Sequence, residues 1–138
     1  MTLVDSSVFM YAAGREHPLK KRAIAFLESA AEGSVEAVTD AEVLQEILHR
    51  YRYLKRWQEG RLVYDTARML FPEVLAVTGE VMDRARALMD EQGRFMARDA
   101  LHAAVVAVYG LASITSFDPD FDRVPWLKRV EPQEVAKR

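Results

Sequence analysis

The sequence predicts an α/β fold: a single three-layer α/β/α domain over residues 1–138, with a central parallel sheet of four or five strands. Short apolar runs alternate with helical stretches, which is the pattern of a parallel sheet covered on both faces. The chain has 138 residues, half of them hydrophobic, which is enough for one domain with a sizeable core. Residues 103–109 are apolar on every side, as expected of a helix buried between other elements.

Strands are predicted where a short apolar run ends in a polar or turn residue. The first covers residues 2–4 and leads through Asp5 into a helix. The others are residues 35–38, 74–77 and 113–116, with an edge strand around 128–130.

The helices between these strands are predicted from capping residues and helix breakers. Thr39 and Glu42 have capping-box spacing at the start of a long helix. The dipeptide Glu59-Gly60 is predicted to break this long helix. Thr78 caps a later helix, and Gly110 ends the buried one. The predicted helices are 19–31, 39–57, 61–71, 80–90 and 97–109, after the short one that follows the first strand.

Composition narrows the class of protein. The formal charge of −2 argues against a nucleic-acid-binding surface over the whole molecule, so any basic patch must be local. Without cysteine, disulfides and Cys-ligated zinc are excluded, which fits a reducing cytoplasm. The N-terminus has no signal-peptide pattern, and the longest apolar run is far below the ~20 residues of a membrane span. We therefore expect a cytoplasmic protein with no membrane contact.

Four acidic residues are predicted to reach one end of the sheet. Asp5 follows the first strand and Asp118 follows the fourth, while Glu46 lies on the helix after the second strand. Asp99 lies in the first turn of the buried helix, where an unpaired carboxylate is costly. Ligands of open parallel sheets gather at the carboxyl ends of the strands. Clustered carboxylates need a cation between them, and an all-oxygen set suits Mg²⁺ or Mn²⁺.

Each acid also has a purely structural interpretation. Asp5 and Asp118 are both placed to cap the helical turns that follow them, with Pro119 at the first position of the second turn. Glu46 is spaced for an ion pair with Arg50 one turn later. Asp99 is the acid for which a structural role is hardest to find. Glu42 is a capping-box acid and also a competitor on the same helix, and Asp120 and Asp122 are either solvated or support Asp118.

One basic stretch, residues 49–57, extends the helix that carries Glu46. Arg50, Tyr53 and Trp57 are spaced i, i+3 and i+7, so one helix face would present a cation and two rings together. Such a face suits single-stranded RNA, whose phosphates attract cations and whose bases stack on rings. The alternative is a solvated face with aromatic residues that contact a neighbouring helix or a partner protein.

Four motifs together resemble the PIN-domain nucleases, in particular the VapC-like toxins of toxin–antitoxin pairs. They are Val4-Asp5-Ser6-Ser7, Val43-Leu44-Gln45-Glu46, Arg98-Asp99-Ala100-Leu101-His102-Ala103-Ala104 and Ser116-Phe117-Asp118-Pro119-Asp120-Phe121. They occur in the family's order and span nearly the whole chain.

The resemblance implies an acidic quartet of Asp5, Glu46, Asp99 and Asp118 that holds Mg²⁺ or Mn²⁺, with Asp5 and Asp99 as the surest ligands. Ser6 and Ser116 match hydroxyl positions that order these acids, whereas Glu42, Asp120 and Asp122 could compete with them or assist. His102 lies one turn after Asp99 and is assigned to a contact with a neighbouring helix rather than to Asp99.

The activity implied by the family is metal-dependent hydrolysis of RNA phosphodiester bonds by an endoribonuclease. The implied partners are the RNA substrate, an antitoxin protein and a second copy of the chain. Two alternatives remain at this point. One is an RNA-processing nuclease of the same fold without an antitoxin, and the other is a binding module that keeps an acidic pocket but performs no catalysis.

Overall fold

The computed structural model describes residues 1–136 and contains a five-stranded, all-parallel sheet in the order β3-β2-β1-β4-β5. The first strand lies at its centre, so β1 pairs with β2 on one side and with β4 on the other. The predicted α/β/α fold is confirmed. The strands are β1 (Thr2–Val4), β2 (Ala37–Asp40), β3 (Val74–Leu75), β4 (Ser113–Thr115) and β5 (Arg129–Val130).

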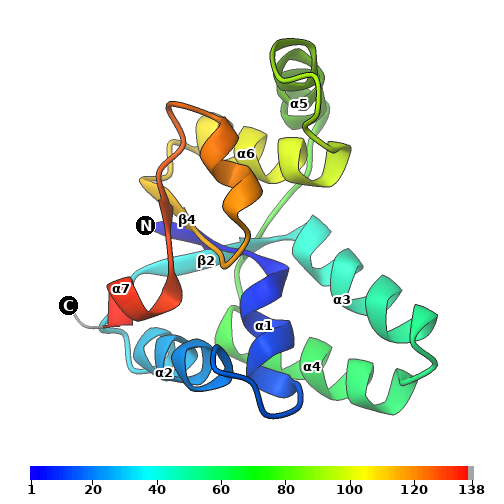
Figure 1. Ribbon diagram of the computed structural model, residues 1–138, viewed down its shortest axis with the longest axis vertical. Helices are drawn as coiled ribbons and strands as arrows, with labels where there is room; N and C mark the ends of the chain where they lie inside the picture. The colour runs from blue at the N-terminus through cyan, green and yellow to red at the C-terminus, as the bar shows by residue number, and fades with distance from the viewer. Residues whose placement is uncertain (137–138) are drawn as a thin grey trace.

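Helices cover both faces of this sheet (Figure 1). The helical elements are α1 (Ser6–Ala13), α2 (Lys20–Ala31), α3 (Ala41–Tyr53), α4 (Trp57–Leu70), α5 (Gly79–Glu91), α6 (Ala97–Tyr109), the 3-10 turn η1 (Pro119–Arg123) and α7 (Pro132–Ala136). Leu3 points into the core formed with α5, α6 and η1, whereas Val4 points into the core formed with α1 to α4. Adjacent strand residues thus serve opposite layers.

The apolar helix α6 is buried as predicted. Residues 100–106 are all buried, and Gly110 ends the helix in the left-handed conformation with φ of 66°. Because its middle is fixed in the core, its first turn is held rigidly at the carboxyl end of the sheet. That first turn carries Asp99.

The boundary between α3 and α4 differs from the prediction. The break falls at residues 54–56, where Lys55 adopts a φ of 59°, and Gly60 lies inside α4 rather than ending a helix. A Cβ atom on Gly60 would lie 2.5 Å from Cβ of Tyr51. Gly60 therefore allows α3 and α4 to approach closely. In sequence, the pattern Glu59-Gly60 looks the same for such a contact as for a helix break.

The start of α3 also needs a correction. Its capping side chain is Asp40, whose Oδ1 accepts a hydrogen bond of 2.9 Å from the backbone N–H of Val43. Thr39, the predicted cap, donates from Oγ1 to the carbonyl oxygen of Val4 instead. Thr78 caps α5 as predicted. The short helix α7 was not predicted, and within residues 1–136 no helix has both the length and the hydropathy to cross a bilayer.

Candidate metal centre and adjoining groove

The carboxyl ends of β1 and β4 form the crevice of the sheet. From β1 the chain enters the helical layer that contains Val8, and from β4 it enters the opposite layer through Phe121. Adjacent parallel strands whose continuations diverge in this way leave an opening between them. Asp5 follows β1 and Asp118 lies just beyond β4, so the topology brings these two ends of the chain together.

Asp5 is held by hydrogen bonds from two serines. Its Oδ2 accepts from Oγ of Ser116 at 2.7 Å and from Oγ of Ser7 at 3.0 Å, while its side chain makes no capping bond to α1. The predicted role of Ser116 agrees with this geometry, but the serine of α1 that donates to Asp5 is Ser7 and not Ser6. Burial, partly offset by His102, raises the pKa of Asp5.

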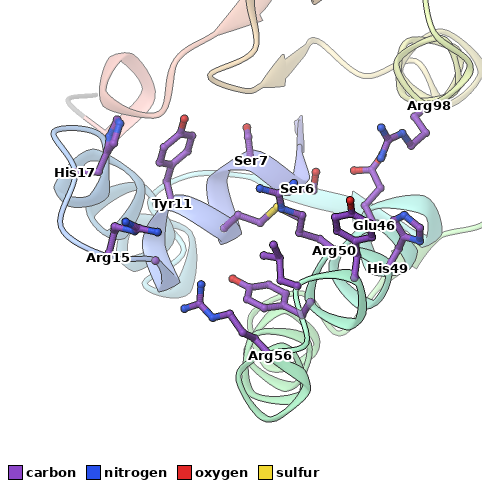
Figure 2. Close-up of a pocket in the computed structure, with 15 residues that line it drawn as sticks. Ser6, Ser7, Tyr11, Arg15, His17, Glu46, His49, Arg50, Arg56 and Arg98 are labelled. Carbon is purple, nitrogen blue, oxygen red and sulfur yellow. The ribbon is translucent and has the colours of Figure 1, made fainter.

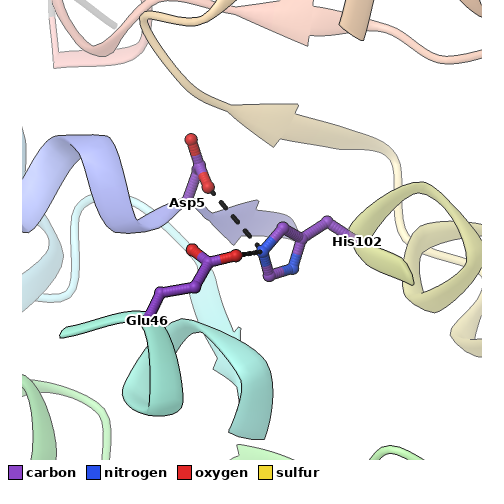
Figure 3. Close-up of side chains that lie close together, drawn as sticks. All are labelled: Asp5, Glu46 and His102. Carbon is purple, nitrogen blue, oxygen red and sulfur yellow. Dashed lines mark hydrogen bonds and ion pairs between the residues drawn. The ribbon is translucent and has the colours of Figure 1, made fainter. Parts of the chain in front are cut away.

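His102 connects two further carboxylates, those of Asp40 and Glu46, near this crevice. Figure 3 shows His102 with Glu46 and Asp5. Its Nδ1 lies 2.8 Å from Oδ2 of Asp40 and its Nε2 lies 2.9 Å from Oε1 of Glu46. Nε2 is also 3.9 Å from Oδ1 of Asp5. Burial alone lowers the pKa of His102, but the attraction and hydrogen bonds of Asp40 and Glu46 outweigh it, so the pKa lies well above its usual value. Glu46 faces His102 and is buried, which contradicts the alternative interpretation of Glu46 as a surface charge paired with Arg50.

A second acidic group lies at the first turn of α6 and at the turn after β4. Ligand atoms of Asp99, Asp118 and Asp120 lie within 4.8 Å of one another, and all three side chains are half-buried. Burial, and then the negative charges of Asp118 and Asp5, raise the pKa of Asp99 to about 6. Asp118 also caps η1, since its Oδ1 accepts from the N–H of Asp120. Its capping role and its place in an acidic group therefore coexist.

The predicted single cluster is thus divided into two neighbouring groups. One comprises Asp5, Glu46 and His102, and the other comprises Asp99, Asp118 and Asp120. Within residues 1–136, no such group of three contains both Asp5 and Asp99, although the negative charge of Asp5 contributes to the raised pKa of Asp99. Oxygen ligands that repel one another fit a hard divalent cation. Asp120 belongs to the group with Asp99 and Asp118, whereas Asp122 accepts hydrogen bonds from Arg129.

Arg129 restrains the turn that carries Asp118 and Asp120. Its guanidinium donates to both carboxylate oxygens of Asp122, at 3.0 and 3.1 Å, and to the carbonyl oxygen of Ser116 at 3.1 Å. Such a two-pronged pair restrains both partners. The edge strand β5 therefore supports the loop between Ser116 and Asp122 from outside.

A groove of about 830 Å³ runs from Glu46 between α1 and α3 (Figure 2). Figure 2 shows Arg98 and Glu46 on one side of it and Arg15 and His17 on the other. Four arginines line it, Arg15, Arg50, Arg56 and Arg98, together with the imidazoles of His17 and His49 and the aromatic rings of Tyr11, Tyr51 and Tyr53.

The three predicted RNA contacts separate in the structure. Arg50 and Tyr53 line the groove, but α3 ends at Tyr53 and Trp57 begins α4. The predicted common face of Arg50, Tyr53 and Trp57 is therefore wrong. The guanidinium carbon of Arg52 lies over the ring of Trp57, 4.4 Å from the centroid of that ring, in a cation–π contact.

Sequence reasoning missed Asp40, Ser7 and Arg98. Asp40 closes a strand and precedes a helix, which is the same signal that identified Asp5, so the carboxyl-end rule could have found it. Ser7 and Arg98 are next to the predicted site residues Ser6 and Asp99. Only the local backbone geometry decides which of two neighbouring residues faces the site. Ser6 and Glu42 lie near the site: Ser6 lines the groove, and the charge of Glu46 contributes to a raised pKa of Glu42 after burial.

Comparison with known proteins decides the family. The model of the PIN domain matches residues 2–127. The chain belongs to the PIN-domain family. This PIN domain is 42% identical over 130 residues to a VapC ribonuclease of Mycobacterium bovis, across 94% of this chain and 99% of the relative. It is 37% identical over 118 residues to ribonuclease VapC23 of Mycobacterium tuberculosis, across 86% and 93%. The predicted resemblance to VapC-like PIN toxins is confirmed.

Solved structures share the fold of this PIN domain. VapC20 of Mycobacterium tuberculosis, described as a toxin that cleaves the sarcin–ricin loop, superposes with a TM-score of 0.71 at 19% identity, over 88% of this chain and 93% of that one. FitAcB from Neisseria gonorrhoeae gives a TM-score of 0.72 at 17% identity, over 96% and 98%. The three-layer architecture is therefore that of PIN proteins of known structure.

Proposed function

We propose that this PIN domain, residues 1–138, is a Mg²⁺- or Mn²⁺-dependent endoribonuclease and the toxin of a toxin–antitoxin pair. The observation that carries the proposal is the position of Asp99. It is a half-buried carboxylate whose pKa is raised by burial and by Asp118 and Asp5, at the crevice between β1 and β4. The VapC relatives of this chain, which are named ribonucleases, match it over nearly their whole length.

Asp5, Asp99, Asp118 and Glu46 would hold the metal, with Asp120 beside them. A bound divalent ion lowers the pKa of a coordinated water and offsets charge on the phosphate oxygens of RNA. Ser116 and Ser7 orient the carboxylate of Asp5, and the cap to Asp120 orients that of Asp118. These hydrogen bonds orient the carboxylates around the crevice before the substrate binds.

The RNA strand would occupy the groove between α1 and α3. Four arginines line this groove although the protein carries a net charge of −2, so positive charge is concentrated beside the acidic groups. Phosphates would pair with Arg50, Arg15 and Arg98, and bases would stack on Tyr53, which is 76% exposed. The guanidinium of Arg56 is already paired with both carboxylate oxygens of Glu59. Trp57, in a separate helix and under Arg52, would be at the margin of this path.

A toxin of this kind acts in the cytoplasm, where it would be held by an antitoxin protein and would form a homodimer. An RNA-processing nuclease without an antitoxin would share the site but would purify from its host without a bound protein. A binding module would retain RNA without cutting it. These outcomes separate the proposed toxin from both alternatives.

The decisive experiment is an RNA cleavage assay with Mg²⁺ or Mn²⁺, with EDTA, and with Asp99→Asn. We expect cleavage only when metal is present and only in the unsubstituted protein, while circular dichroism shows the same fold for both. Asp83→Asn, on the exposed part of α5, is the matched control and should cleave normally. Full cleavage by Asp99→Asn would show that the site has been misplaced.

A further inference from the structure

The buried chain Asp40–His102–Glu46 has no part in the function proposed so far beyond the presence of Glu46. His102 and Asp40 are 0% exposed and Glu46 is 7% exposed. Both ring nitrogens of His102 are bonded, at 2.8 Å to Asp40 and at 2.9 Å to Glu46. Burial of three ionisable groups is unfavourable unless each is paired and hydrogen-bonded, so the arrangement calls for an explanation.

Asp40 is fixed independently of His102. Its Oδ1 accepts the hydrogen bond from Val43 that caps α3, which leaves Oδ2 aimed at the ring of His102. His102 in turn projects from the buried part of α6. The ring is therefore anchored on two rigid elements before it reaches Glu46.

Glu46 by contrast borders open space. It lines the groove, and a glutamate side chain has three rotatable bonds, so without a partner it would lose its single orientation toward Asp5. The contact with Nε2 of His102 holds its carboxylate inside the site, next to Asp5 (Figure 3).

We propose that His102 is a positioning residue that holds the carboxylate of Glu46 beside Asp5, and that Asp40 sets the orientation of the His102 ring. The inference rests on the proposed function, in which Glu46 takes part in the metal centre. Because His102 is fully buried, it acts on the reaction through Glu46 and makes no contact with RNA. Its replacement should therefore lower kcat and leave KM for RNA unchanged.

Two substitutions separate the two sides of the ring. The amide nitrogen of Asn occupies approximately the place of Nδ1 and that of Gln the place of Nε2. His102→Asn thus keeps a donor for Asp40 and loses the one for Glu46, whereas His102→Gln does the reverse. We expect kcat to fall about 10- to 100-fold in His102→Asn, as for other residues that orient metal ligands, and most of this loss to be recovered in His102→Gln. Equal kcat in the two variants overturns the proposal.

Asp40→Ser tests the other end of the chain without removing the cap of α3, since serine accepts the same backbone hydrogen bond. We expect a lower kcat at unchanged KM. An unchanged kcat would contradict the role of Asp40. This variant also keeps the question open to measurement if substitution of His102 itself prevents folding.

A double-mutant cycle separates positioning from a general effect on the fold. In the Glu46→Gln background, His102→Asn should lower kcat no further, because the residue that it positions is already altered. The same fold-reduction in both backgrounds would show a merely structural role and overturn the proposal.

The contact itself can be measured without metal or RNA. In the metal-free protein the ring ¹⁵N resonances of His102 should shift on Glu46→Gln and shift less on Glu42→Gln, which alters an acid one turn earlier on α3. Absence of the larger shift overturns the contact. If the shift is present but Glu46→Gln cleaves RNA normally, the role of Glu46 in the proposed function is wrong while the contact stands, so the two failures are distinguishable.

Discussion

The hydroxyl of Ser116 donates a 2.7 Å hydrogen bond to the carboxylate of Asp5, across 111 residues of sequence. The same oxygen accepts a bond of 3.0 Å from the backbone N–H of Asp118. One buried serine therefore ties the end of β1 to the turn after β4. This bond explains why Asp5 turns into the crevice and leaves the first turn of α1 without a capping side chain.

We predict that Ser116→Ala destabilises the protein by about 1–3 kcal/mol and also reduces RNA cleavage, because a buried carboxylate loses a donor and Asp118 loses an anchor. Ser113→Ala, at the start of the strand that Ser116 follows, is the matched control. It removes a buried hydroxyl bonded to Thr2, away from the acidic groups, and should lower stability without affecting cleavage. Urea denaturation and a cleavage assay measure the two effects, and equal loss of cleavage in both variants would contradict the prediction.

The raised pKa of Asp99, about 6, predicts a pH dependence of the metal-free protein. A carboxyl group whose pKa is higher in the folded than in the unfolded state binds more protons when folded. The contribution of Asp99 to the free energy of unfolding is therefore fully present at pH values below its ordinary carboxyl pKa. It is lost as the pH rises through the folded-state pKa of about 6. Asp99→Asn should therefore gain in melting temperature relative to the unsubstituted protein between pH 5 and pH 7. Mg²⁺ should reduce that difference by stabilising only the unsubstituted protein.

Those melting curves are to be recorded with EDTA and then with Mg²⁺, at constant ionic strength. A difference in melting temperature that stays constant across this pH range would contradict the burial of Asp99 beside other negative charges. A difference that Mg²⁺ leaves unchanged would contradict its role as a metal ligand.

The arginine-lined groove predicts a charge-dependent KM. Arg50→Glu and Arg15→Glu should each raise KM for RNA and make binding less sensitive to salt, since fewer cations contact phosphates. Arg86→Glu is the control, because this arginine of α5 is exposed and pairs only weakly with Asp90 at 3.4 Å. Fluorescence anisotropy with a labelled single-stranded RNA measures binding at several salt concentrations. An unchanged affinity in both groove variants would favour a protein as occupant of the groove.

Gly60→Ala is predicted to destabilise the pair of helices α3 and α4. The added Cβ would lie 2.5 Å from Cβ of Tyr51, and relieving such an overlap costs about 1–3 kcal/mol. Gly79→Ala, in the first turn of α5 where no atom lies within 4 Å of the added Cβ, should leave stability unchanged or slightly higher. Thermal melting of the two variants tests the contrast, and similar melting temperatures would contradict it.

Much of this fold could be predicted because local patterns and tertiary structure agree. The apolar run after His102 could only be a buried helix, and Thr78 and Gly110 marked helix ends through their local chemistry. Gly60 was misread because a glycine that ends a helix and one that admits a neighbouring helix look alike in sequence. Only the position of Tyr51 distinguishes them.

The candidate site was predicted less completely than the fold. The carboxyl-end rule brought Asp5, Asp99 and Asp118 to one edge, but it could not assign each to a group. Which of Ser6 and Ser7 faces Asp5 depends on the turn into α1, and the link from Asp40 to Glu46 passes through a histidine 56 residues from Glu46 in the chain. Such long-range side-chain contacts have no local sequence signal.

The central place of β1 has a consequence for how the protein is made. β1 precedes β4, its neighbour on one side, along the chain, so their pairing must wait until residues 113–115 have been synthesised. A nascent chain that lacks Ser116 cannot fix Asp5, and one that lacks Asp118 has no second acidic group. The crevice is therefore complete only once the segment from β4 to Asp120 has been added, so both acidic groups depend on the same late pairing of β1 with β4.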